Sequence, residues 1–284
     1  RLVEHQHLQR RVGQHRAQPG QARRHHGQQL VDAFGLAQQH DRAFGAAPEL
    51  VGEMGSATIG GLQDNMVVAC GKHFPGHGDT ATDSHKELPV VDAGLQRLRD
   101  TEFPPFQQAI RYGVAGLMTA HVLYRALDPE APATLSSAVI QRLLREEFRY
   151  EGVVFTDDLE MHAIIDHDGI GEAAVRSFVA GCDVLLICKD QDRVMTAMQA
   201  MERAVKDGRI TQERLDQSLA RVAKLKARYL HPYKPVTISD ARLVVGCRSH
   251  KVLLDSWHKA YARIPKPTLV ERGQAAPPHD SPVT

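Results

Sequence analysis

The residues best suited to chemistry lie together in one short stretch, KHFPGHGDTATDSH, at residues 72–85. It contains three histidines, two aspartates and a lysine, set around two glycines and a proline. Side chains of these types can coordinate a metal ion, bind a phosphate group or transfer protons. The stretch therefore marks a candidate site, and its chemistry has to be decided from spacing and from partners elsewhere in the chain.

A metal site here would take its ligands from His73, His77 and His85, with Asp79 and Asp83 as further candidates. His73 and His77 are four positions apart, a spacing that places two ligands on one face of a helix. A proline and a glycine between them exclude a helix, so the spacing does not favour a metal. The glycines also lack the order of a phosphate-binding P-loop. We expect no metal and no cofactor, and keep as an alternative a metal-dependent hydrolase that uses the three histidines.

A second stretch, FTDDLEM at residues 155–161, adds two adjacent carboxylates. Asp157 and Asp158 follow an apolar strand, where a carboxylate is costly to bury unless it is solvated, paired or used. Asp83 and His85 form an Asp-x-His pair in the first stretch. Together the two stretches offer a nucleophile and a general acid/base with a residue to orient it.

The elements that must position these residues alternate between strands and helices from about residue 47 onward. Apolar strands are predicted at 66–71, 115–121, 152–156 and 183–188, and helices at 48–63, 95–112, 138–148, 171–181, 190–207 and 211–229. This alternation indicates parallel strands covered by helices. Each polar motif follows a strand, which is where a (β/α)8 barrel or a doubly wound sheet builds its site. The polar residues 162–168 are expected to form a solvated loop before the helix at 171.

The two stretches together, in this order, resemble glycoside hydrolase family 3, and in particular its β-N-acetylglucosaminidases (the β-N-acetylhexosaminidase subgroup). Three shorter motifs resemble the same subgroup: RAFG at 42–45, MTAH at 118–121 and PATLS at 132–136. The resemblance runs from about Arg42 to about Leu230 and implies a TIM-type (β/α)8 barrel. It also implies a glycosidase that removes terminal β-linked N-acetylglucosamine from small carbohydrate substrates such as peptidoglycan fragments.

The resemblance implies a role for each residue that matches a family motif. Asp157 matches the nucleophile, His85 the acid/base, and Asp83 the residue that orients it. The sugar-binding positions are matched by Arg42, Lys72 and His73, and further candidates for the pocket lining are His121 and Met161. A histidine that donates a proton must begin charged, and the nearby Asp83 would raise its pKa from an unperturbed value of about 6.5.

Two variants of the reaction and one loss of function stay open. A histidine acid/base does not repel phosphate, so a phosphorylase is an alternative to a hydrolase, as is a β-glucosidase of the same family. Members of the subgroup open with βα units that carry an Asp-Gln-Glu-Gly-Gly-like motif, and nothing in 1–41 resembles it. We therefore expect a barrel that is incomplete or modified at its N-terminal strands, and an inactive truncated barrel remains an alternative.

Composition divides the chain into three segments and excludes several classes of protein. Residues 1–41 are rich in Gln, His and Arg and are expected to be disordered or mistranslated, 42–230 form the catalytic barrel, and 231–284 are an extension with a helix near 249–262. A formal net charge of +1 does not indicate a nucleic-acid partner. The chain has no apolar run of about 18 residues, so no membrane association is predicted. Four cysteines in no zinc-like spacing predict a cytoplasmic protein.

Overall fold

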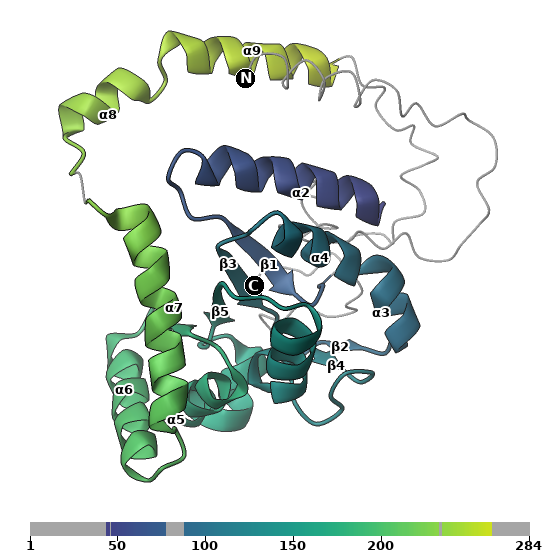
Figure 1. The fold of residues 1–284 in the computed structure, drawn as a ribbon, viewed down its shortest axis with the longest axis vertical. Coiled ribbons are helices and arrows are strands. Elements are labelled where there is room, and N and C mark those ends of the chain that lie inside the picture. The colour runs from purple at the N-terminus through teal and green to yellow at the C-terminus, as the bar shows by residue number, and fades with distance from the viewer. Residues whose placement is uncertain (1–43, 46, 78–87, 233–234, 263–284) are drawn as a thin grey trace, which may run out of the picture. The chain divides into compact units, whose positions relative to one another are not determined.

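The computed structural model describes residues 44–45, 47–77, 88–232 and 235–262 (Figure 1). The chain divides into two compact units, of which the first ends at Tyr229 and the second begins at Leu230. Each unit is considered by itself. None of the helices in the described ranges combines the length and the apolar character that crossing a bilayer would require.

The first unit is built on a parallel sheet in which strand order follows chain order. The sheet contains β1 (Cys70–Phe74), β3 (Gly116–Thr119), β5 (Val153–Asp158) and β6 (Val184–Leu186), in the order β1-β3-β5-β6. A separate parallel pair is formed by β2 (Val90–Val91) and β4 (Leu123–Tyr124). Each new strand of the larger sheet is added beside the previous one, as in a (β/α)8 barrel, and the order does not reverse as it does in a doubly wound sheet.

Helices connect these strands and cover the sheet (Figure 1). They are α2 (Pro48–Gln63), α3 (Leu95–Thr101), α4 (Phe103–Arg111), η1 (Ala133–Leu135), η2 (Ala138–Glu147, wound as a π-helix), α5 (His162–Ala180), α6 (Gln191–Lys206) and α7 (Gln212–Leu230). Both α2 and α4 begin with prolines in the first turn, where a missing N–H costs nothing. Helix α2 packs on α4, and α5 packs on α6.

Two glycines allow α2 to approach α4 and the residue that follows it closely. A Cβ on Gly52 would lie 2.2 Å from Gln108 Oε1, and a Cβ on Gly60 would lie 2.7 Å from the Tyr112 hydroxyl. Both separations are shorter than carbon and oxygen atoms tolerate, so only glycine fits at these two positions without displacing a neighbour.

An aromatic cluster forms the core between β1 and the helices. The ring of Phe74, on β1, lies edge-on to Phe106 at 5.2 Å and to Phe148 at 6.0 Å, and Phe148 in turn meets Phe103 at 5.4 Å. Phe74, Phe103 and Phe106 are buried almost completely. Edge-to-face pairs of this kind add about 0.5–1.5 kcal/mol each beyond their buried area. The cluster holds β1, which carries Lys72 and His73, against α4 and the end of η2.

A buried carboxylate joins the opposite, N-terminal ends of β5 and β6. The Asp183 side chain is completely buried. It accepts hydrogen bonds from Arg145 Nη2 at 2.7 Å, Arg221 Nη1 at 3.1 Å, Ser218 Oγ at 2.6 Å and Val154 N at 3.0 Å, and Arg214 Nη2 lies 3.6 Å away. This network fixes α7 and η2 to the sheet.

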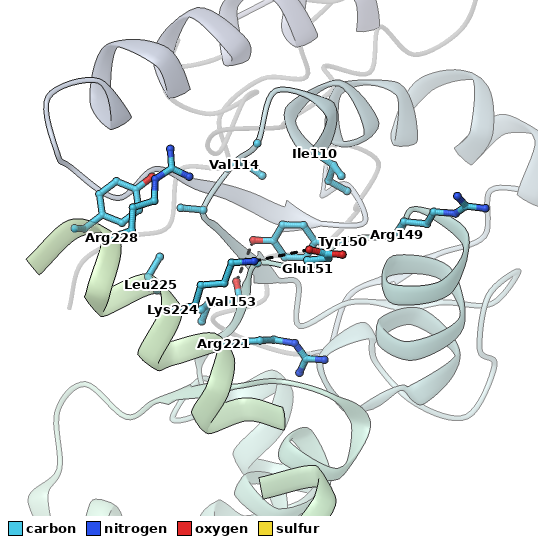
Figure 2. A pocket seen from close by; sticks show the side chains of 14 residues that line it. Ile110, Val114, Arg149, Tyr150, Glu151, Val153, Arg221, Lys224, Leu225 and Arg228 are labelled. Atoms are coloured by element: carbon cyan, nitrogen blue, oxygen red, sulfur yellow. Dashed lines mark hydrogen bonds and ion pairs between the residues drawn. The ribbon is translucent and has the colours of Figure 1, made fainter. Parts of the chain in front are cut away.

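A cavity of about 310 Å³ lies at the same N-terminal ends of the strands (Figure 2). Residues that precede β3 and β5 line one side, and one face of α7 lines the other, where Lys224 Nζ lies 3.9 Å from Glu151 Oε2. This cavity is at the far end of the strands from Asp157 and does not belong to the candidate catalytic site.

The structure corrects two boundaries predicted from sequence. The strand predicted at 66–71 begins only at Cys70, because residues 64–67 form a hydrogen-bonded turn that closes α2 and gives Met66 a φ of +62°. Lys72 and His73 therefore lie within β1 rather than in the loop after it. The predicted loop at 162–168 is wrong, because these residues form the first turns of α5, which is kinked at Gly169. The polar residues there pair along the helix, as in the contact of 3.0 Å between His162 Nδ1 and Asp166.

The C-terminal unit contains two helices in its described part, α8 (Ile238–Val244) and α9 (Arg248–Ala262). Thr237 and Asp240 form a reciprocal capping box at the start of α8. Helix α9 matches the helix predicted near 249–262. Its apolar side chains Val252, Leu253, Leu254 and Trp257 are exposed within this unit.

Candidate active site

The candidate site gathers at the C-terminal ends of β1 and β5. Asp157 is the fifth residue of β5, and its side chain is 23% exposed. Its Oδ2 lies 3.4 Å from Nε2 of His73, a buried side chain on β1. Strand β3 lies between β1 and β5, so the register of three strands sets this distance. The structure thus brings together one residue from each of the two sequence stretches.

Burial keeps His73 neutral beside this carboxylate. Desolvation lowers the pKa of His73 to about 3, although the Asp157 charge acts in the opposite direction, and Lys72 lowers the pKa further. A neutral imidazole with its proton on Nε2 presents that N–H to Asp157 and leaves Nδ1 as an acceptor. Within the described residues, Nδ1 of His73 has no hydrogen-bond partner. The contact with Asp157 therefore stabilises the carboxylate without adding a cation.

The two adjacent aspartates differ in what their polar atoms do. Asp158 Oδ1 accepts the Glu160 N–H at 3.1 Å, and the Asp158 carbonyl accepts the Met161 N–H at 3.0 Å, so this residue shapes the turn into α5. Among the residues that the structure describes, Asp157 Oδ1 accepts only the N–H of Asp158, at 2.8 Å. Its other oxygen faces His73 at the strand end. Of the two carboxylates, Asp157 is the one with an oxygen directed toward His73 on strand β1.

His121 lies just past the end of β3 and is almost completely buried. Its Nδ1 is 2.8 Å from Thr134 Oγ1, and its Nε2 is 3.0 Å from the carbonyl oxygen of Asp158. Burial is the main cause that lowers the pKa of His121, so the ring is neutral. Both ring nitrogens are thus occupied by partners from the protein itself.

Sequence reasoning missed the role of Glu160. Its buried carboxylate accepts the backbone N–H groups of Cys188 at 2.9 Å, Lys189 at 2.6 Å and Asp190 at 3.2 Å, and Arg193 Nη1 lies 3.3 Å away. The acid therefore ties the loop after β6 to the loop after β5. The position of this glutamate between the apolar residues Leu159 and Met161 indicated that it is buried. Its partners could not be predicted, because they lie about 30 positions away in the sequence.

The structure places five of the eight residues predicted for the site. Asp157 and His73 meet at the strand ends, and Lys72 precedes His73 on β1. The charges of Lys72 and Asp157 both act on the Cys70 thiol, and His121 and Met161 are buried. The predicted residues Arg42, Asp83 and His85 lie outside the described residues. In the described ranges no three His, Cys, Asp or Glu side chains are arranged to hold a metal ion.

Comparison with known proteins identifies the family. Residues 36–225 match the family model described as the glycosyl hydrolase family 3 N terminal domain. The chain is 38% identical over 188 residues to a beta-hexosaminidase of Nitrosomonas eutropha, a match that covers 65% of this chain and 54% of that protein. It is 40% identical over 159 residues to a beta-hexosaminidase of Alkalilimnicola ehrlichii, with coverage of 56% and 45%. The chain thus spans about half the length of the curated relatives it matches.

A solved structure extends the similarity to the fold. The glycoside hydrolase family 3 beta-N-acetylglucosaminidase from a Paenibacillus species is similar with a TM-score of 0.68 and 47% sequence identity, over 69% of this chain and 38% of that one. The family resemblance and the TIM-type α/β fold predicted from the sequence are both confirmed, and the described residues supply four parallel strands of the larger sheet. The chain belongs to glycoside hydrolase family 3, and its sheet is part of that family's TIM-type barrel.

Proposed function

We propose that this chain carries the catalytic site of a retaining β-N-acetylhexosaminidase, with Asp157 as the nucleophile. One observation carries the proposal: Asp157 stands at the end of β5 with Oδ2 facing a neutral His73 at 3.4 Å, while Oδ1 and the carbonyl of Asp158 accept N–H groups of the turn into α5. The names of the relatives, beta-hexosaminidase and beta-N-acetylglucosaminidase, support the reaction class.

The proposed reaction proceeds in two displacements. Asp157 attacks the anomeric carbon as the bond to the leaving oxygen breaks, and His85 gives that oxygen a proton. In the second step His85 takes a proton from water, the water oxygen attacks the anomeric carbon, and Asp157 is released as a carboxylate. Asp83 would orient the imidazole of His85. The roles of His85 and Asp83 rest on the motif at 72–85, because both lie outside the described residues.

Binding of the sugar is assigned to the residues that match the family motif. Lys72 and His73 lie on β1, a strand held by the aromatic core, so their side chains are placed on a rigid element. Arg42 is the third proposed sugar ligand. The substrate class is terminal β-linked N-acetylglucosamine, including fragments of peptidoglycan. The four cysteines are free thiols, which supports the proposed cytoplasmic location.

Covalent labelling tests the nucleophile directly. A 5-fluoro N-acetylglucosaminyl fluoride should trap the glycosyl-enzyme, and peptide mapping should place the label on Asp157. The variant Asp157→Asn should lose both turnover and labelling, whereas Asp158→Asn should label at the same position. A label on Asp158, or on any other residue, would overturn the assignment.

Two further measurements test the substrate and the acceptor. Aryl β-N-acetylglucosaminides should exceed aryl β-glucosides in kcat/KM, because a pocket for the acetamido group contributes to the transition state of only one of them. Addition of inorganic phosphate should yield free sugar and no sugar 1-phosphate. Formation of the 1-phosphate would replace the hydrolase with a phosphorylase and leave the nucleophile unchanged.

A further inference from the structure

We infer that His121 is a positioning residue for Asp157: held by Thr134, it binds the carbonyl of Asp158 and fixes the end of the strand that carries the nucleophile. The inference rests on the proposed function, since it assigns His121 to the same site. It gives His121 a role in holding the protein backbone, in place of a direct contact with the sugar.

The partners of His121 decide where its proton lies. The Asp158 carbonyl can only accept a hydrogen bond, so Nε2 of His121, at 3.0 Å, must carry the hydrogen. The neutral ring then has Nδ1 as an acceptor, and the hydroxyl of Thr134 is 2.8 Å away. Nδ1 has no other donor in the described residues. Thr134 therefore donates to His121, and His121 donates to Asp158.

The hydroxyl of Thr134 has a second acceptor within reach, the carbonyl of Ala120 at 3.0 Å. That carbonyl already accepts the backbone N–H of Thr134 at 3.3 Å. The contact with His121 is shorter, and Nδ1 of His121 would otherwise lack a donor. The Thr134 hydroxyl therefore donates its hydrogen to Nδ1 of His121. The hydroxyl of Thr119 lies 2.9 Å from Thr134 Oγ1 and 3.4 Å from the carbonyl of Phe155, and it can donate to the nearer Thr134 oxygen. All of these groups are buried, where an unpaired polar atom is destabilising.

The chain of hydrogen bonds crosses from η1, past the end of β3, to the end of β5. The carbonyl of Asp158 accepts the hydrogen bond from His121, and the N–H of Asp158 donates to Oδ1 of the neighbouring Asp157. The position of the nucleophile is therefore set through the peptide that follows it. Attack on the anomeric carbon requires reacting atoms to be aligned within a few tenths of an ångström, and a misplacement of about 1 Å costs about 100-fold in rate.

Protonation of the ring would reverse its bond to Thr134, because Nδ1 would then donate to the Thr134 oxygen and the Thr134 hydroxyl would donate to the Ala120 carbonyl. Desolvation is the largest effect on the pKa of His121 and lowers it. The nearby carboxylates of Asp157 and Asp158 act in the opposite direction, and His77 acts with the burial. The net lowering of the pKa keeps the His121 ring uncharged at neutral pH.

Two pairs of variants separate the proposed role from packing. His121→Gln places an amide N–H near the Nε2 position and keeps the bond to Asp158, whereas His121→Asn is too short to reach it. Thr134→Ser keeps the hydroxyl, and Thr134→Val removes it at nearly constant volume. With an aryl β-N-acetylglucosaminide, His121→Asn and Thr134→Val should lose about 10- to 100-fold in kcat with KM changed less than about 2-fold. His121→Gln and Thr134→Ser should keep most of the wild-type kcat.

Thr196→Val is the matched control, because the exposed Thr196 hydroxyl bonds only to a carbonyl of its own helix, and this variant should keep the wild-type kcat. If His121→Asn does not fold, the Thr134 pair carries the test. Equal losses in the Gln and Asn variants, or losses confined to KM, would overturn the inference in favour of packing or of sugar binding.

A measurement that does not depend on turnover completes the test. Nitrogen-15 NMR of the His121 ring should show the neutral tautomer with its hydrogen on Nε2, and Thr134→Val should shift the Nδ1 resonance. A neutral ring with its hydrogen on Nδ1 would overturn the inference even in an active enzyme, because Nε2 could then not donate to Asp158. A wild-type chain without glycosidase turnover would instead overturn the proposed function, and the positioning role of His121 with it.

Discussion

Replacing the buried carboxylate of Asp183 by an amide should strongly destabilise the barrel unit, which is the first unit and ends at Tyr229. Oδ2 of Asp183 accepts from Arg145 and from the N–H of Val154, and Oδ1 accepts from Ser218 and Arg221. Asn supplies only one oxygen and turns its NH2 group toward donors that were paired with the other. One of the two sets of donors therefore loses its acceptor in Asp183→Asn, whichever way the amide is turned.

The size of the effect follows from burial and charge. The Asp183 side chain is fully buried, and burial is the main cause that lowers the pKa of both Arg145 and Arg214, with Asp183 acting against it. The carboxylate thus compensates for the loss of hydration of these guanidinium charges. Removal of one member of a buried ion pair costs about 3–5 kcal/mol. That is a large part of the about 5–15 kcal/mol by which domains are stable.

Urea unfolding followed by circular dichroism measures the loss, and Glu147→Gln is the matched control. Glu147 also pairs with an arginine, Arg99, at 2.7 Å, but both side chains are 41% exposed. The same change of acid to amide should therefore cost less than about 1 kcal/mol there. Equal losses for Asp183→Asn and Glu147→Gln would refute the reasoning, because burial would then have no influence on the strength of the pair.

Three other predictions concern buried or exposed groups near the candidate site. Burial lowers the pKa of His73 to about 3 and also lowers that of His121, so below a pH of about 6.5 the unfolded chain binds more protons than the folded one, and the free energy of unfolding decreases as the pH is lowered. His73 alone should reduce it by about 1.4 kcal/mol between about pH 7.5 and 5.5. Urea unfolding measures this dependence on pH, which should be weaker in His73→Gln. Glu160→Gln should accelerate hydrogen exchange of the amides that follow β6, since the amide group can accept from fewer of them, and unchanged exchange would mean that the loop holds itself. In the native protein a thiol reagent should modify the exposed Cys188 and spare the buried Cys182, whose pKa burial raises to about 12; modification of Cys182 at the rate seen in urea would contradict its burial.

Local signals predicted the elements that are marked by local chemistry. The helix at 48–63 is found with its predicted ends because Pro48 begins it and the turn after Gln63 closes it. The apolar runs of β3, β5 and β6 identified the strands, and the polar residues after them identified the edge of the sheet where the candidate site lies. The start of β1 was missed because the apolar run MVVAC continues from the closing turn of α2 into the strand without a break.

Contacts between distant parts of the chain could not be read from the sequence. Helix α5 was predicted too short because Gly169 and the polar residues before it are typical of a loop. In the structure the residues before Gly169 are helical, Gly169 itself forms a non-helical kink, and Arg176 pairs with Asp168 across it. Asp183 has partners 38 positions away in both directions, Arg145 and Arg221. Sequence patterns report local geometry, and these partners are fixed only when the sheet has formed. The roles of Asp157, Asp83 and His85 stay predictions from the family motif.

The placement of the single tryptophan gives the chain a built-in optical reporter. Trp257 is the one tryptophan in the sequence, and it lies on α9 in the C-terminal unit with its side chain 62% exposed. Its fluorescence therefore reports on the C-terminal unit, because the aromatic residues of the barrel unit are phenylalanines and tyrosines. Far-ultraviolet dichroism, in contrast, is dominated by the helices of the barrel. Coincident transitions by the two signals would show that the units melt as one cooperative body, and separate transitions would show that each keeps its own stability.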